Sequence, residues 1–251
     1  MDFKQLYDTC SALEDPGFWQ DAYMKFYRAW FVGERWKQYF QGLVTTLEVT
    51  VIALIIGVVV GVLVAVIRTS HDQQRPGHKS LVLGVVNALM RIYITVIRGT
   101  PLMVQMLIMG FVIFSSSRNH TMVGALALGI NSGAYVAEII RGGLMALDSG
   151  QMEAGRSLGL SYFDTMRFIV VPQAFKAILP SLGNEFITLL KDTSLISVVA
   201  GREIVYFAQA IVARTYEAMY PYLITAVMYL ILVLIFTWLQ GRLERRLRQS
   251  D

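Results

Sequence analysis

The chain has 251 residues, of which 55% are hydrophobic and 16% are charged, and its mean hydropathy is +0.52. Soluble domains carry about 25% charged residues, so this balance indicates a membrane protein. The basic residues behind the net charge of +4 are spread over short loops, which favours an anionic membrane surface over a nucleic-acid face. The single cysteine, Cys10, excludes an intrachain disulfide and a cysteine-based metal site.

The first 41 residues are rich in aromatic and basic side chains, and no cleavable signal is expected before the first apolar stretch, because the segment is polar and has no apolar core. Rings such as Trp19 and Trp30 alternate with basic groups such as Lys25 and Arg28. This mixture is typical of an amphipathic helix that lies in the membrane interface. An ordinary capping helix, packed on the neighbouring spans, fits the same pattern.

The first membrane span is predicted over Leu43–Ile67. At about 1.5 Å per residue this helix would be about 37 Å long, enough to cross a hydrocarbon core of about 30 Å with some tilt. Gly57 and Gly61 form a small-xxx-small pair, which lets two helices approach closely. A polar loop is predicted over Arg68–Lys79.

The apolar stretch Leu81–Phe114 is too long for one straight span and is predicted to break at Arg98-Gly99-Thr100-Pro101. Pro101 removes a backbone donor, and Gly99 loosens the turn before it. Broken helices at membrane depth are tolerated where they line a cavity or pack on protein. Arg98 could face such a cavity or extend to the lipid headgroups.

The third span is predicted over Met122–Leu147. Asn131, Tyr135 and Glu138 share one face of this helix, and a polar stripe within a span is expected to face the interior of the bundle. Glu138 and Arg141 are three residues apart, so an ion pair between them is an alternative to contact with a solute.

A polar insert, residues 148–177, follows the third span. Glu153–Ser157 is predicted to end one short helix, and Gly159 to supply a turn. Ser161 is predicted to be the N-cap of a second short helix. This second helix is predicted to end at Pro172, because the residue before a proline disfavours helical geometry.

The fourth span is predicted to begin at Leu179-Pro180, with the proline in its first turn. Ser181, Glu185, Thr188 and Asp192 recur every three or four residues, and such groups are costly to hold in lipid. They are therefore expected to face water or one another. Lys191 and Asp192 together match the carboxylate and ammonium of an amino acid, but they could equally pair within the protein.

The last part of the chain combines an external stretch, a span and a basic end. Gly201–Ala218 is predicted to be amphipathic and external. Tyr220–Leu239 is predicted to be the fifth span, with aromatic anchors at both ends. The expected division is an N-terminal segment (1–41), a transmembrane domain (42–240) and a basic cytoplasmic tail (241–251).

The polar insert resembles the EAA loop of bacterial ATP-binding-cassette importer permeases. The matching pattern is Glu153-Ala154-Gly155, then Gly159, then Ile169-Val170-Val171-Pro172. Here Gly155 stands where the family usually has a second alanine, and Val171 where it usually has leucine. Three further blocks resemble the polar amino-acid branch of that family, the histidine/glutamine type; they begin at Arg98, Asn131 and Leu190. The resemblance covers about residues 38 to 245.

The resemblance implies an all-α integral membrane fold of five transmembrane helices, with cytoplasmic EAA coupling helices and an N-terminal interfacial helix. It implies no catalytic residue and no metal site on this chain, which is expected not to be an enzyme. The residues expected to couple to an ATPase are Glu153, Ala154, Gly155, Ser157, Leu158 and Gly159. Those expected to line the substrate pathway are Arg98, Gln105, Tyr135, Glu138, Glu185, Thr188, Lys191, Asp192 and Thr193.

The resemblance also implies the partners. They are a pair of ATPase subunits that bind ATP and Mg²⁺, a second permease subunit (identical or related), an external solute-binding protein, an amino acid and the lipid bilayer. The chain has no phosphate-binding Gly-x-x-x-x-Gly-Lys-Ser/Thr motif and is expected to hold no cofactor itself. No nucleic-acid partner is expected.

The basic residues are too evenly divided between the two sides to fix the topology. The resemblance places the EAA loop and the C-terminus in the cytoplasm and the N-terminus outside a bacterial plasma (inner) membrane. Two other functions fit the residues alone. The acids Glu138, Glu185 and Asp192 could serve an ion-coupled secondary amino-acid transporter, and the insert could dock a protein in a structural or signalling subunit. ATP dependence separates the first of these from an importer.

Overall fold

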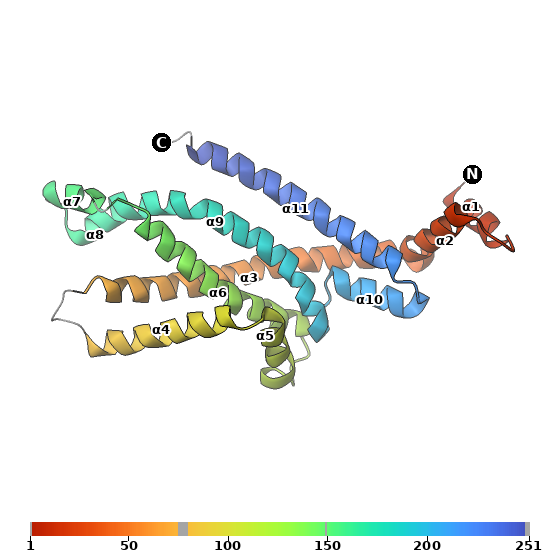
Figure 1. The fold of residues 1–251 in the computed structure, drawn as a ribbon, viewed down its shortest axis with the longest axis horizontal. Helices are drawn as coiled ribbons and strands as arrows, with labels where there is room; N and C mark the ends of the chain where they lie inside the picture. The colour runs from red at the N-terminus through yellow and green to blue at the C-terminus, as the bar shows by residue number, and fades with distance from the viewer. Residues whose placement is uncertain (1, 75–79, 149, 249–251) are drawn as a thin grey trace.

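A computed structural model describes residues 2–74, 80–148 and 150–248, and every regular element among them is a helix (Figure 1). Part of the predicted 68–79 loop (75–79), one residue of the insert (149) and the end of the tail (249–251) lie outside the described residues. The α-helices are α1 (Phe3–Ser11), α2 (Phe18–Trp30), α3 (Arg35–Asp72), α4 (Leu81–Gly99), α5 (Leu102–Ile108), α6 (His120–Met145), α7 (Gly150–Ser157), α8 (Tyr162–Thr165), α9 (Val171–Asp192), α10 (Ile204–Thr215) and α11 (Met219–Arg248).

Four described helices are long and apolar enough to cross a membrane, and a helix pair bent by 45° brings the number to five. The four single helices correspond to α3, α4, α6 and α11. The bent pair consists of the helical segment Tyr162–Val199, which includes α9, and α10. The predicted all-α membrane fold of five spans is therefore confirmed. The predicted divisions after residues 41 and 240 fall inside α3 and α11, so the helices continue through both.

The packing of α3 against α6 forms the centre of the bundle. On α3, a Cβ atom added at Gly57 would lie 2.8 Å from the Ser132 hydroxyl oxygen, and one at Gly61 would lie 2.6 Å from Val136. The relation is mutual, because a Cβ added at Gly129 of α6 would lie 2.6 Å from Ile56. Side chains of each helix thus pack directly over glycines of the other helix, as the Gly57/Gly61 pair predicts.

The second predicted span breaks where the sequence indicates. α4 ends at Gly99, and Thr100 and Pro101 are extended before α5 begins. The side-chain amide nitrogen (Nε2) of Gln105 donates hydrogen bonds to the carbonyl oxygens of Ile97, at 2.7 Å, and of Thr100, at 3.1 Å. These bonds satisfy carbonyls that the broken helix leaves free. The helix after α5 widens into a π turn, Met109–Ile113.

Two predicted helix boundaries are wrong. The second helix of the insert does not end at Pro172, and the fourth span does not begin at Pro180, because one helical segment runs from Tyr162 to Val199. A π turn over Met166–Val170 leads into Pro172, and the Val171 N–H donates to the Met166 carbonyl oxygen. This wider turn places Pro172 in the first turn of α9, where a missing N–H costs little.

Pro180 lies inside α9. The side-chain amide nitrogen of Gln240, on α11, lies 3.2 Å from the Pro180 carbonyl oxygen and 2.9 Å from the Asn184 side-chain oxygen, so α11 is hydrogen-bonded to α9 beside the proline. Because the helical segment continues through Pro180, the fourth span is continuous with the polar insert.

One more expectation needs correction. Arg68 does not begin a loop, because α3 continues through it to Asp72. The stretch predicted to be amphipathic and external forms α10, and its Ile204, Ala208 and Ile211 are buried in one cluster with Tyr39 and Leu190. These apolar side chains hold α10 against α3 and α9, so that it packs within the bundle.

The two ends of the molecule carry different elements (Figure 1). The helices of the insert, α7 and α8, lie at the end of the molecule where α3 ends and α4 begins. The helices α1 and α2 lie at the opposite end, beyond the start of α3. The N-terminal segment, predicted as one interfacial helix, consists of two helices in a hairpin. The last turns of α11 point toward the end that carries the insert.

The close α3–α6 contact makes Gly61 intolerant of a single methyl group. We expect Gly61→Ala to lower the free energy of unfolding by about 1–3 kcal/mol, because the methyl group would overlap Val136. Gly84→Ala in α4 is the matched control, since a Cβ there meets nothing within 4 Å and alanine favours helix. Unfolding midpoints in detergent measure both. Equal stability of the two variants would contradict the packing argument.

Candidate functional site

The polar insert folds as a compact helix-turn-helix. α7 ends at Ser157, and Gly159, at φ +84°, forms the turn in the left-handed region that glycine favours. The Ser161 hydroxyl oxygen accepts a hydrogen bond from the Asp164 backbone N–H at 3.1 Å, which caps α8. The turn and the N-cap predicted from the sequence are both confirmed.

The residues predicted to couple to an ATPase differ in exposure. Glu153, Ala154, Ser157, Leu158 and Gly159 are exposed. Leu158 is 81% exposed, although it lies in a polar segment. Phe163 and Phe168 are also exposed, so the insert presents an apolar surface beside a carboxylate. Exposed apolar patches with polar rims typically mark protein–protein contacts.

Gly155 is the exception, because it is buried between the two helices of the insert. A Cβ atom there would lie 2.5 Å from the Thr165 side chain and 3.1 Å from Ile169. The departure from the usual second alanine of the EAA pattern therefore has a packing reason. Gly155 lets α7 lie directly against the helix that begins at α8.

The insert is tied to the membrane helices at three places. Its second helix runs without a break into α9. The Gln173 amide nitrogen, on α9, donates to Gln151 of α7 at 3.1 Å. The Tyr162 hydroxyl donates to Gln73, which directly follows α3. The insert is thus connected to α9 and α3 through covalent continuity and side-chain hydrogen bonds.

The first group of predicted pathway residues lies where α4, α5 and α6 meet. The Asn131 amide donates to the Gln105 side-chain oxygen at 2.9 Å. The Arg98 guanidinium lies over the Tyr135 ring, 5.2 Å from its centroid, where cation–π attraction holds it. Both Arg98 and Tyr135 remain exposed on the described chain.

The second group lies on α9 and divides between two faces. Ser181, Asn184, Thr188 and Lys191 are exposed and recur every three or four residues, so they form one polar stripe. Glu185 instead turns toward α6, where its carboxylate accepts a hydrogen bond from the Ser132 hydroxyl at 2.7 Å. The predicted stripe therefore has an outer and an inner part.

The last predicted pathway residues, Asp192 and Thr193, lie at the end of α9. Asp192 is partly buried. Thr193 is fully buried: its hydroxyl donates to the Leu190 carbonyl oxygen at 2.7 Å and lies 3.3 Å from the Tyr229 hydroxyl. The structure thus gathers the predicted pathway residues into separate groups rather than one cluster, and it directs Thr193 into the protein.

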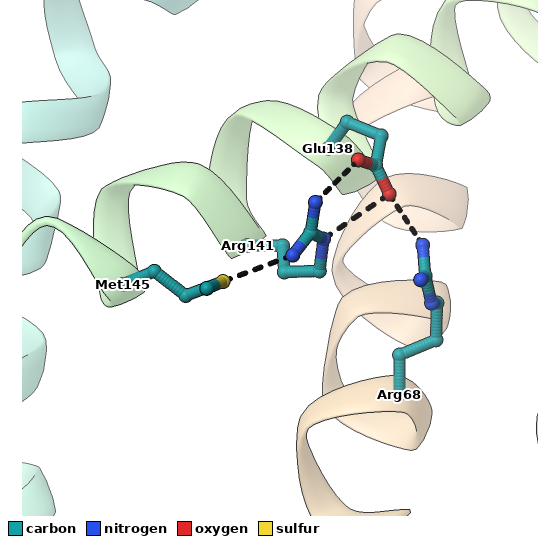
Figure 2. A network of polar contacts seen from close by, with 4 residues as sticks. All are labelled: Arg68, Glu138, Arg141 and Met145. Atoms are coloured by element: carbon teal, nitrogen blue, oxygen red, sulfur yellow. Dashed lines mark hydrogen bonds and ion pairs between the residues drawn. The ribbon is translucent and has the colours of Figure 1, made fainter. Parts of the chain in front are cut away.

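Glu138 is the centre of a charged network between α3 and α6 (Figure 2). Its carboxylate pairs with Arg141, 2.9 Å away on the same helix, and with Arg68 of α3. Arg141 also extends to the Met145 sulfur. The predicted Glu138–Arg141 pair is confirmed. Sequence reasoning missed Arg68, whose signal was its position directly after the first apolar run.

Glu203 is a further buried acid that sequence reasoning missed. It is fully buried and caps α10, accepting hydrogen bonds from the backbone N–H groups of Val205 at 2.7 Å and Tyr206 at 2.8 Å. The Tyr229 hydroxyl of α11 donates to the same carboxylate at 2.8 Å. The signal in the sequence was an acid directly before an apolar helical stretch. Among the described residues, no group of three or more His, Cys, Asp or Glu side chains could hold a metal ion.

The charged network predicts unequal effects at its two partners. Glu138→Gln removes the only carboxylate of the network and leaves two guanidinium groups facing each other, so we expect it to cost about 1–3 kcal/mol of unfolding free energy. Arg68→Gln should cost less, because Glu138 keeps Arg141, and the buried Arg68 Nε has no partner in the described structure to lose. Denaturant unfolding in mixed micelles compares the two variants. A larger loss in the Arg68 variant would contradict this assignment.

The comparisons with known proteins agree with one another. Residues 81–249 match the family described as "Binding-protein-dependent transport system inner membrane component". The glutamine transport system permease protein GlnP of Escherichia coli is 39% identical over 168 residues, which are 65% of this chain and 77% of that protein. The arginine transport system permease protein ArtQ of Bacillus subtilis is 37% identical over 186 residues, which are 68% and 85% of the two chains.

Solved structures share the fold. A chain of an amino acid ABC transporter crystallised with histidines superposes with a TM-score of 0.75 at 40% identity, covering 84% of this chain and 94% of that chain. A chain of the MetNI methionine ABC transporter, in an inward-facing conformation, superposes with a TM-score of 0.69 at 17% identity, covering 84% of this chain and 96% of that chain. At this identity the likeness shows the fold alone. This chain belongs to the family of inner membrane components of binding-protein-dependent transport systems.

Proposed function

We propose that this chain is the permease subunit of an ATP-driven importer for polar amino acids. The observation that carries the proposal is the exposed helix-turn-helix of α7 and α8, fixed to α9 in a chain of this transport family. Relatives named for glutamine and arginine support the substrate class. An exposed helix-turn-helix of this kind suits the binding of a protein partner whose movements displace the membrane helices.

ATP and Mg²⁺ are bound by a pair of partner ATPase subunits, because this chain has no phosphate-binding loop motif. The outer surface of α7, with Glu153 and Leu158, enters a cleft on that partner. When ATP draws the two ATPase subunits together, the motion passes through the insert to α9. The chain performs no bond chemistry, and its residues bind, orient and move.

The exposed polar stripe of α9 forms one wall of the pathway. Asn184, Thr188 and Lys191 lie on the outside of the single chain within a span, where contact with lipid would be costly. A second permease chain, identical or related, supplies the opposite wall and keeps this face in water. Lys191 and Asp192 offer opposite charges to the carboxylate and ammonium of an amino acid.

The orientation follows from the coupling role. If α7 and α8 meet an ATPase, their end of the molecule is cytoplasmic, together with the end of α11. The hairpin of α1 and α2 then lies outside the bacterial inner membrane, on the side where a solute-binding protein delivers its cargo.

The coupling surface is tested by Leu158→Glu. We expect this variant to lose most of the ATPase subunit on purification in mild detergent, because a charge would enter an apolar contact. Leu81→Glu is the matched control, since Leu81 is 83% exposed and is the first residue of α4, which begins at the same end of the molecule. The control should retain a stoichiometric ATPase. Equal retention by both variants would contradict docking through Leu158.

The transport function is tested in proteoliposomes that contain the complete complex. Uptake of radiolabelled glutamine or arginine should require ATP and the solute-binding protein, and should persist when ionophores collapse the proton and sodium gradients. Uptake that needs an ion gradient and ignores ATP would favour the ion-coupled transporter instead.

A further inference from the structure

The N-terminal hairpin is a rigid unit built from stacked rings. The rings of Tyr7 and Tyr27 are 4.6 Å apart between centroids, and those of Phe3 and Phe31 are 5.6 Å apart. The Tyr23 hydroxyl donates to the Phe3 carbonyl oxygen at 2.7 Å. These contacts join α1 to α2 along their length, so the turn between them is held in place from both sides.

The hairpin is also fixed to the membrane helices at its base. The Trp30 ring stacks on Tyr39 of α3, with centroids 5.6 Å apart, and Phe26 meets Tyr220 of α11 at 6.5 Å. The Lys25 ammonium nitrogen lies 3.9 Å from a carboxylate oxygen of Glu217, which comes just before α11. The base of the hairpin is therefore level with the aromatic start of the last span, and its tip points away from the bundle (Figure 1).

The tip exposes two large aromatic side chains that the fold does not use. Phe18 is 76% exposed and Trp19 is 81% exposed, and their rings make an edge-to-face pair with centroids 5.2 Å apart. Exposed tryptophans in rigid positions are typical of the anchors that supply most of the energy of protein interfaces. The side-chain oxygen of Gln20 accepts a hydrogen bond from the Gly17 backbone N–H at 2.7 Å, which fixes the first turn of α2.

The charges at the tip argue against two possible binding partners of these rings, an anionic lipid surface and the tip of a second copy of the chain. Glu14 and Asp15 are exposed beside them and form no ion pair among the described residues. Two carboxylates disfavour an anionic lipid surface. They also disfavour the same tip of a second copy, which would bring like charges together.

The position of the tip adds a second argument against lipid. Phe18 lies eight residues before Phe26 on α2, which is about 12 Å along the helix axis. Phe26 is already level with Tyr220, where the last span begins. The tip thus lies beyond Tyr220, at the end of the molecule opposite α7 and α8, which favours contact with an aqueous partner over contact with lipid.

We propose that Phe18 and Trp19 dock the solute-binding protein, entering an apolar pocket that is ringed by basic side chains. This inference rests on the proposed function, which makes the hairpin external, and on the description of the family as binding-protein-dependent. The rigid hairpin presents the two rings with little conformational entropy left to lose, and the acidic pair selects a basic rim.

The test measures the affinity of the complete complex, in nanodiscs, for the fluorescently labelled solute-binding protein that supports uptake. The double variant Phe18→Ala with Trp19→Ala should raise the Kd at least tenfold and leave the basal ATPase rate unchanged. Phe18→Tyr with Trp19→Phe, which keeps both rings, should stay within about twofold of the unaltered complex. Glu14→Lys with Asp15→Lys should also weaken binding, more at low salt than at high salt.

The outcomes separate the inference from the function on which it rests. If the unaltered complex binds the solute-binding protein and the double alanine variant binds it equally well, the docking role is wrong while the importer stands. If no solute-binding protein supports uptake by the unaltered complex, the proposed function is wrong.

A lipid measurement provides an independent check. Trp19 fluorescence, taken as the difference between the unaltered chain and Trp19→Phe, should be quenched by iodide in solution and not by brominated phospholipid. Quenching by the brominated lipid would overturn the inference and make the tip a membrane anchor.

Discussion

The contact between α3 and α6 is the constraint on which the rest of the structure depends. In a membrane the hydrophobic effect does not drive helices together, so association rests on close packing. The glycines of both helices accept side chains of the other, Gly61 against Val136 and Gly129 against Ile56. This contact sets the distance across which Glu138 reaches Arg68, and it carries polar groups of α6 toward α5 on one side and α9 on the other.

The continuity of α8 with α9 gives the fold its second property, a direct mechanical link between the aqueous insert and the spans. A helix transmits displacement because its backbone bonds resist extension, and the π turn before Pro172 keeps the helical path intact. Bonds from Gln173 and Tyr162 fasten the remaining side of the insert. The exposed surface of α7 and the polar stripe of α9 therefore lie on helices that pack and hydrogen-bond directly to each other.

The polar groups within the spans fall into two classes that differ in what satisfies them. Glu138, Glu185 and Glu203 each have partners within the chain and stabilise particular helix contacts. The stripe that contains Thr188 and Lys191 is exposed on the single chain, which is the arrangement expected of a surface that a second subunit and water complete. The chain thus separates the polar groups that hold the bundle together from those that stay exposed on the single chain.

The sequence by itself determined the class of the protein, the helix break at Pro101, the turn at Gly159 and the close contact through Gly57 and Gly61. Each of these depends on local backbone chemistry or on the apolar content of a stretch. Only the tertiary structure decided that the helix passes through Pro172, which follows a π turn, and through Pro180, because a proline weakens a helix locally without fixing where a packed helix ends. It also decided which polar residues turn inward, since helical spacing places a side chain on a face but does not say what that face meets.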